Sequence, residues 1–259
     1  MEEQKALEEL RRDESSRGAF LKMVGGAGAA GALGIFLAAC GDDDKKDEAA
    51  KTSEEKKPAA DSNKGDAAIV NYALTLEYLE ATFYTEALGG KGTEGVPGSS
   101  ARFNRGRITG SKRLAGFGGR IRRNAYGYLT DIRNHEITHV EFLRDQLGAA
   151  AVGPCEFKFS AALTNVGTFL ETAQLLENTG VMAYDGAIRY VDAGDTLQAG
   201  AQIATVEARH AAYLNLINRD SPFPSAFDQG KKPSEIFAAA KPFIVDCPAN
   251  VKALFARLP

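Results

Sequence analysis

HEITHVEFL, residues 135–143, places the side chains of Glu136 and His139 within a segment that is otherwise typical of a buried helix. Apolar residues at helical spacing flank the pair, including Ile132 before it and Leu143 after it. Positions i and i+3 share one face of a helix, so both side chains point the same way. A polar group on a buried face is costly unless it is paired or binds a metal ion. The side chains of Glu136 and His139 are therefore expected to have a polar partner or a metal ion inside the fold.

Three other segments interrupt an apolar stripe in the same way. Glu207 and His210 form a second Glu-x-x-His pair. The other two segments each carry a lone glutamate with a tyrosine two helical turns later. These residues are Glu77 with Tyr84 and Glu177 with Tyr184. The order along the chain is Glu, Glu-x-x-His, Glu, Glu-x-x-His, so the second half repeats the polar pattern of the first.

The apolar periodicity predicts an all-α fold, an antiparallel four-helix bundle followed by short C-terminal helices. The bundle should occupy residues 66–220, and residues 221–259 should form an extension packed on it. A Gly-, Arg- and Lys-rich segment, residues 90–119, reads as a long loop inserted into the first half. The predicted long helices are 66–88, 120–147, 160–191 and 195–218, and the short ones are 233–240 and 249–257.

Composition indicates one globular domain of ordinary charge. Apolar residues make up 44% of the chain, charged residues 25%, and the formal net charge is -3. Without an excess of basic residues, the chain as a whole is not expected to bind nucleic acid.

The first forty residues have the layout of an export signal. A basic flank precedes an uncharged Gly/Ala-rich stretch, which ends in Leu-Ala-Ala-Cys40. This ending resembles a bacterial lipoprotein box, which would make Cys40 the lipidated residue; the alternative is an uncleaved anchor helix. Ser16–Lys22 resembles the twin-arginine motif, but Gly18 replaces its second arginine. The sequence therefore does not distinguish twin-arginine export from Sec export, and a lipoprotein box does not need the twin-arginine route. Both readings place the protein in the cell envelope, anchored to a membrane or periplasmic or extracellular, with 41–65 as a disordered linker.

The polar pattern suits a pair of metal ions. Four carboxylates can neutralise two divalent cations inside a low-dielectric core, and carboxylate oxygen with imidazole nitrogen suits iron and manganese. Carboxylates that bridge the ions can hold them roughly 3.5–4 Å apart. Incomplete coordination leaves room for O2 or H2O2. The predicted ligands are Glu77, Glu136, His139, Glu177, Glu207 and His210.

These residues, within the stretches 71–84, 135–143, 176–184 and 206–213, resemble the ferritin-like superfamily. In particular they are similar to a bacterial ferritin-like domain family related to plant desiccation-related proteins. The resemblance implies two Fe ions, with Mn as the alternative, bridged by Glu136 and Glu207. It also implies a ferroxidase- or peroxidase-type oxidoreductase of envelope stress protection, and an oligomer is compatible with it. Glu80 is an extra ligand or a residue that supports a ligand.

Several alternatives stay open at this stage. The bundle can be a non-catalytic structural or desiccation-protective module with a vestigial metal site, or a manganese catalase-like enzyme. The Glu-x-x-His pairs can lie on surfaces. Tyr84 and Tyr184 are predicted to support the ligands or to take part in redox chemistry, the alternative being ordinary core aromatics. His135 lies off the apolar face and should be solvated. The basic residues of 102–123 can form a solvated, mobile loop or bind an anionic surface such as lipid head groups.

Cys155 and Cys247 are the cysteines that remain after Cys40. In an oxidising compartment they are expected to form a disulfide between the loop before the third helix and the C-terminal tail, the alternative being two free thiols.

Overall fold

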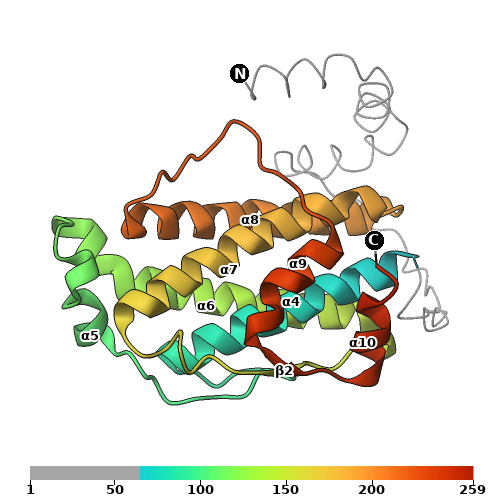
Figure 1. The fold of residues 1–259 in the computed structure, drawn as a ribbon, viewed down its shortest axis with the longest axis horizontal. Coiled ribbons are helices and arrows are strands. Elements are labelled where there is room, and N and C mark those ends of the chain that lie inside the picture. The colour runs from blue at the N-terminus through green and yellow to red at the C-terminus, as the bar shows by residue number, and fades with distance from the viewer. Residues whose placement is uncertain (1–64, 259) are drawn as a thin grey trace, which may run out of the picture. The chain divides into compact units, whose positions relative to one another are not determined.

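The computed structural model describes residues 65–258. Four long helices run side by side and form the bundle (Figure 1). They are α4 (Gly65–Leu88), α6 (Gly119–Leu147), α7 (Val166–Ala187) and α8 (Gly194–Asn218). The predicted all-α bundle is therefore confirmed. The predicted export signal, Cys40 and most of the 41–65 linker lie outside the described residues. Within those residues, no helix combines the length and apolar character that a membrane crossing requires.

The bundle consists of two helix pairs. α4 packs along α6, α7 packs along α8, and α4 also contacts α7 (Figure 1). α4 is buried around most of its circumference, because the C-terminal helix α10 covers it as well. A helix buried on all sides must be apolar on all sides, apart from polar groups that find partners. The polar residues Glu77 and Glu80 of α4 therefore need partners inside the bundle.

The third long helix begins later than the sequence pattern predicts. The predicted start is residue 160, whereas α7 begins at Val166. Asn165 causes this, since its side chain accepts a hydrogen bond from the backbone N–H of Thr168. The Thr168 hydroxyl is in turn within 3.3 Å of the Asn165 backbone nitrogen, which completes a capping box. Residues 160–163 form a turn before this cap.

The inserted segment 90–119 is more ordered than the expected mobile loop. It contains the short helix α5 (Arg105–Thr109) and the 3-10 turn η1 (Lys112–Leu114). Its apolar side chains Phe103, Ile108 and Leu114 are buried in the main core. Several of its basic groups contact the protein itself: Arg105 and Arg107 lie over aromatic rings, and Arg113 pairs with Glu171. Binding of an anionic surface by this segment stays a prediction.

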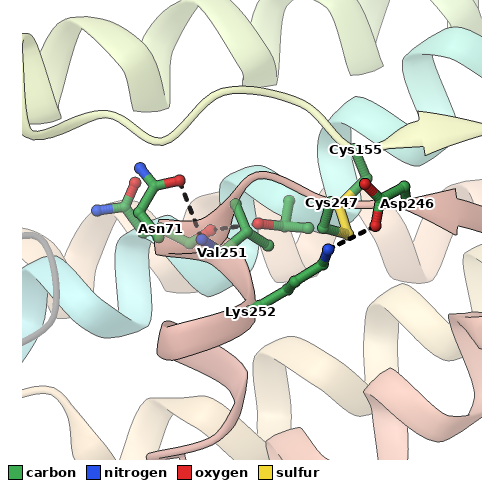
Figure 2. Close-up of a disulfide and its surroundings, with 8 residues drawn as sticks. Asn71, Cys155, Asp246, Cys247, Val251 and Lys252 are labelled. Atoms are coloured by element: carbon green, nitrogen blue, oxygen red, sulfur yellow. Dashed lines mark hydrogen bonds and ion pairs between the residues drawn. A yellow bond between two sulfur atoms is a disulfide. The ribbon is translucent and has the colours of Figure 1, made fainter.

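The C-terminal extension closes one side of the bundle. It consists of α9 (Pro233–Ala240), the turn η4 (Lys241–Phe243), strand β2 (Ile244–Asp246) and α10 (Ala249–Phe255). β2 pairs antiparallel with β1 (Glu156–Phe157), a contact that helical periodicity does not predict. Next to this pairing, Cys155 and Cys247 form the predicted disulfide, beside the ion pair of Lys252 and Asp246 (Figure 2). The extension is thus tied covalently to the loop before α7.

Candidate metal centre

The four polar interruptions meet at one level of the bundle. All four glutamates are fully buried, and His139 and His210 are 8% and 5% exposed. The alternative that the two Glu-x-x-His pairs lie on surfaces is therefore wrong. The buried residues from the four helices are Glu77, Glu136, His139, Glu177, Glu207 and His210.

One group of candidate ligands surrounds His139. Its Nδ1 lies 3.2 Å from Glu77 Oε2, 3.2 Å from Glu136 Oε2 and 3.3 Å from Glu207 Oε1. These four residues each offer one ligand atom, and the atoms all lie within 4.8 Å of one another. This spacing allows a single cation to contact several of them at once.

A second group surrounds His210. Its Nδ1 lies 3.0 Å from Glu177 Oε2 and 3.0 Å from Glu136 Oε1. Glu136, Glu177, Glu207 and His210 again offer ligand atoms within 4.8 Å of one another. Glu136 and Glu207 belong to both groups, so the geometry is that of two adjoining cation sites with two carboxylates in common.

Two tyrosines orient Glu77 and Glu177, the carboxylates that each belong to only one ligand group. The Tyr84 hydroxyl on α4 donates to Glu177 Oε1 on α7 at 2.7 Å. The Tyr184 hydroxyl on α7 donates to Glu77 Oε1 on α4 at 2.5 Å. Each helix therefore holds the other helix's glutamate. Both tyrosines are more than ordinary core aromatics, because each leaves the second oxygen of its glutamate facing a histidine.

Glu80 is a further buried carboxylate beside the centre. It is 3% exposed but belongs to neither group of candidate ligands. Gly180 makes room for it: a Cβ atom at Gly180 would lie 2.9 Å from Glu207 Oε2 and 3.4 Å from Glu80 Oε1. A side chain at position 180 would therefore occupy the space in which these two carboxylates lie.

The predicted exposure of His135 is confirmed, but the sequence pattern did not reveal its contact with the centre. His135 is exposed in part, yet its Nδ1 lies 2.8 Å from Nε2 of His210, and the two rings stack. His210 is thereby contacted on both nitrogens, by carboxylates at Nδ1 and by His135 at Nε2. A partner of this kind fixes the tautomer and ring orientation of a histidine.

Three carboxyl groups of the centre, those of Glu80, Glu136 and Glu207, hold protons more tightly than an ordinary glutamate. Burial raises the pKa of Glu80 and of Glu207, and the neighbouring carboxylates raise both further. Burial and the charge of Glu177 raise the pKa of Glu136 to about 7. Burial acts in the same direction on Glu77, but the adjacent His139 outweighs it and lowers the pKa of that carboxyl.

The neighbouring carboxyl groups raise the pKa values of the two histidines. Burial lowers the pKa of His210, but the adjacent carboxylates of Glu136 and Glu177 outweigh burial and raise it to about 11. The pKa of His139 is raised too, against burial, by the adjacent carboxylates of Glu77, Glu136 and Glu207. In the absence of metal, protons bound to these histidines and glutamates therefore offset the negative charge of the cluster. A cation must displace them, because a ligating histidine is neutral and a ligating glutamate ionised.

The residues fit a pair of divalent cations. Glu136 Oε1 and both oxygens of Glu207 are buried and accept no well-aligned hydrogen bond among the described residues, although His210 Nδ1 lies 3.0 Å from Glu136 Oε1 and His139 Nδ1 lies 3.3 Å from Glu207 Oε1. Buried polar atoms are normally satisfied, and a carboxylate oxygen without a donor is the atom that a cation would bind. These unsatisfied oxygens belong to the two carboxylates that the groups share.

Comparison with known proteins agrees with this geometry. A fission yeast protein, "Protein rds1" of Schizosaccharomyces pombe, is 30% identical over 125 residues. The match covers 48% of this chain and 31% of the yeast protein, so the chain spans about a third of that relative's length. The sequence pattern of the ferritin-like domain matches residues 65–219, from the first residue of α4 to the residue after the end of α8. The buried ligand set and this match lead to one conclusion: the chain belongs to the ferritin-like domain family.

Proposed function

We propose that the protein is a di-iron carboxylate oxidoreductase that oxidises Fe(II) with O2 or H2O2. The observation that carries the proposal is the sharing of Glu136 and Glu207 by the two ligand groups. Two cations bound by these groups would share both carboxylates and would lie close enough together for two-electron chemistry on small oxidants. A pair of ferrous ions supplies two electrons, which together with two protons convert O2 to H2O2, or H2O2 to two waters.

The protein's own side chains would bind the two cations, neutralise their charge and keep the ligands in position. The carboxylates Glu77, Glu136, Glu177 and Glu207 carry the four negative charges that balance two divalent ions. Tyr84 and Tyr184 keep Glu177 and Glu77 turned toward the histidines. Burial excludes bulk water, so these interactions are stronger than they would be at the surface.

The proposal includes a place and a role. The export-signal layout of residues 1–40 and the disulfide Cys155–Cys247 support a location in the cell envelope. Removal of ferrous iron or of peroxide there would limit oxidative damage, so stress protection is the proposed role. A membrane anchor at Cys40 is part of the same proposal.

Metal content is the decisive measurement. The protein is loaded anaerobically with Fe(II) or Mn(II), desalted, and assayed for metal per chain. About two Fe per chain, lost in Glu136→Ala, supports the proposal and justifies O2 and peroxide assays. Preference for Mn would favour a catalase-like enzyme instead. A folded protein without stoichiometric metal would overturn the proposal and favour a structural or desiccation-protective bundle.

A further inference from the structure

An apolar cavity lies in the bundle core on one side of the candidate metal centre. Its volume is about 70 Å³, and all four long helices and the turn η3 (Ile188–Tyr190) contribute to its wall. Small side chains where the helices meet, such as Ala73, Ala187 and Gly200, leave this volume unfilled. Protein cores are usually close-packed, so an open volume of this size needs an explanation.

The cavity reaches the centre through one side chain. Tyr184 forms part of its wall, and the hydroxyl of Tyr184 donates to Glu77 at 2.5 Å. Leu76, the residue before Glu77, lines the cavity as well. At the other side Phe142, which is 38% exposed, and the exposed Gln146 form part of the rim. A molecule in the cavity would therefore lie between solvent and the Tyr184–Glu77 pair.

The lining selects the chemistry of the occupant. None of the residues that line the cavity is charged, and its polar groups are the hydroxyls of Tyr72, Tyr184 and Thr196 and the amide of Gln146. A charged group placed there would lose its hydration without gaining a counter-ion, which is costly. An apolar cavity of about 150 Å³ binds benzene or xenon, so the smaller volume here suits a short hydrocarbon group.

We propose that this cavity is a binding site for a small uncharged apolar molecule, or for the short alkyl end of a larger one. The occupant would contact Tyr184 next to the candidate metal centre while the rest of it extends past Phe142. Binding needs no metal ion, so this proposal and the proposed oxidoreductase function can fail independently.

The test compares ligands of equal length and different charge. The full-length metal-free chain is titrated with 1-hexanol and with hexanoate, and binding is followed by calorimetry and by the rise in melting temperature. Saturable binding of hexanol, with hexanoate at least about tenfold weaker, is the expected result. Equal affinities, or no saturable binding of hexanol, would overturn the proposal.

Two glycines provide a matched pair of variants that locates the binding. Gly200 lines the cavity on α8, Gly127 lies within α6 away from it, and an added Cβ meets nothing within 4 Å at either position. Gly200→Leu should fill the cavity and weaken hexanol binding at least about tenfold, whereas Gly127→Leu should leave it unchanged. Gly200→Ala should give a smaller loss, and it serves if the leucine variant does not fold. Equal weakening by the variants at 127 and 200 would disprove the location.

Discussion

In the first half of the bundle, formed by α4 and α6, Glu77 is followed one turn later by Glu80. In the second half, formed by α7 and α8, Glu177 is followed one turn later by Gly180. The two positions correspond in the repeated ligand pattern, yet one carries a buried carboxylate and the other has no side chain. The absence of a Cβ at Gly180 leaves the space that Glu80 and Glu207 occupy.

The Glu-x-x-His helices differ in the same manner. In α6 the residue before Glu136 is His135, which contacts Nε2 of His210 on the other half. In α8 the residue before Glu207 is Val206, which has no group that could contact His139 in this way. The repeat thus supplies two similar ligand groups, and the departures from it make their surroundings unequal. The two metal positions should consequently differ in affinity.

The largest expected effect is a difference in bound metal between variants that lose a shared ligand and variants that lose an unshared one. Glu207→Ala removes a carboxylate common to both groups and should abolish binding of both ions, whereas Glu77→Ala should abolish binding of about one. Metal per chain after anaerobic Fe(II) loading measures this. Glu141→Ala changes an exposed glutamate of α6 and is the control. Identical losses in Glu77→Ala and Glu207→Ala would contradict the arrangement with shared ligands.

Filling the space at Gly180 should weaken the binding of both ions without removing a ligand. In Gly180→Ala the new methyl group would lie 2.9 Å from Glu207 Oε2, so this carboxylate must move. Loss of a group that orients a metal ligand typically weakens metal binding about 10- to 100-fold, and displacing Glu207 should have an effect of at least this order. Gly127→Ala places the same methyl group on α6 in open space and should leave metal affinity unchanged. Competitive titration with a chelator compares the two, and equal affinities would show that Glu207 does not need this space.

Replacing His135 by the valine that stands at the corresponding position of the second half should weaken the binding of one of the two ions. His135→Val copies Val206 of the second half and removes the contact to His210 Nε2. Without this contact the ring of His210 can rotate or change tautomer, and the ion of its group should bind about tenfold more weakly. The ion of the His139 group should be unaffected. Stepwise metal titration resolves the two events, and equal weakening of both would contradict this role.

Most of the bundle and its ligand set could be predicted because they depend on helical periodicity. Charged residues in four apolar stripes had to be buried, and they are. The six predicted ligands lie in two adjoining groups, although their metal binding stays a prediction. The start of α7 was missed even though the Asn165–Thr168 capping box is visible in the sequence.

Other features depend on contacts between segments distant in the sequence. His135 is adjacent to Glu136 and therefore points away from the apolar face of α6, and the placement of α8 beside α6 brings it to His210. The strands β1 and β2 are too short to show alternation, and they exist because the two segments pair. The cavity beside Tyr184 results from small residues on several helices, each of which is unremarkable by itself.

Changing the pH should alter how strongly metal stabilises the protein. The pKa of Glu136 is raised to about 7 and that of His210 to about 11 in the metal-free fold. Both groups bind protons more tightly folded than unfolded, so the metal-free protein loses stability as pH rises, between about 4.5 and 7 for Glu136 and from about 6.5 to 11 for His210. Metal binding releases these protons and becomes stronger as pH rises. The metal-induced rise in melting temperature should be larger at pH 8 than at pH 6, and the opposite trend would refute the assignment.

The smallest expected effect compares the two tyrosines. Tyr84→Phe leaves Glu177 Oε1 without a donor in a fully buried position, which should destabilise the metal-free protein by about 1–3 kcal/mol. Tyr184→Phe removes the equivalent bond to Glu77, but Tyr184 is only half-buried whereas Tyr84 is fully buried, so water can replace the lost donor more easily. Urea unfolding should therefore show a smaller loss for Tyr184→Phe than for Tyr84→Phe. Equal losses would mean that water does not replace the donor at Glu77, and that the two halves are more alike than their neighbouring residues indicate.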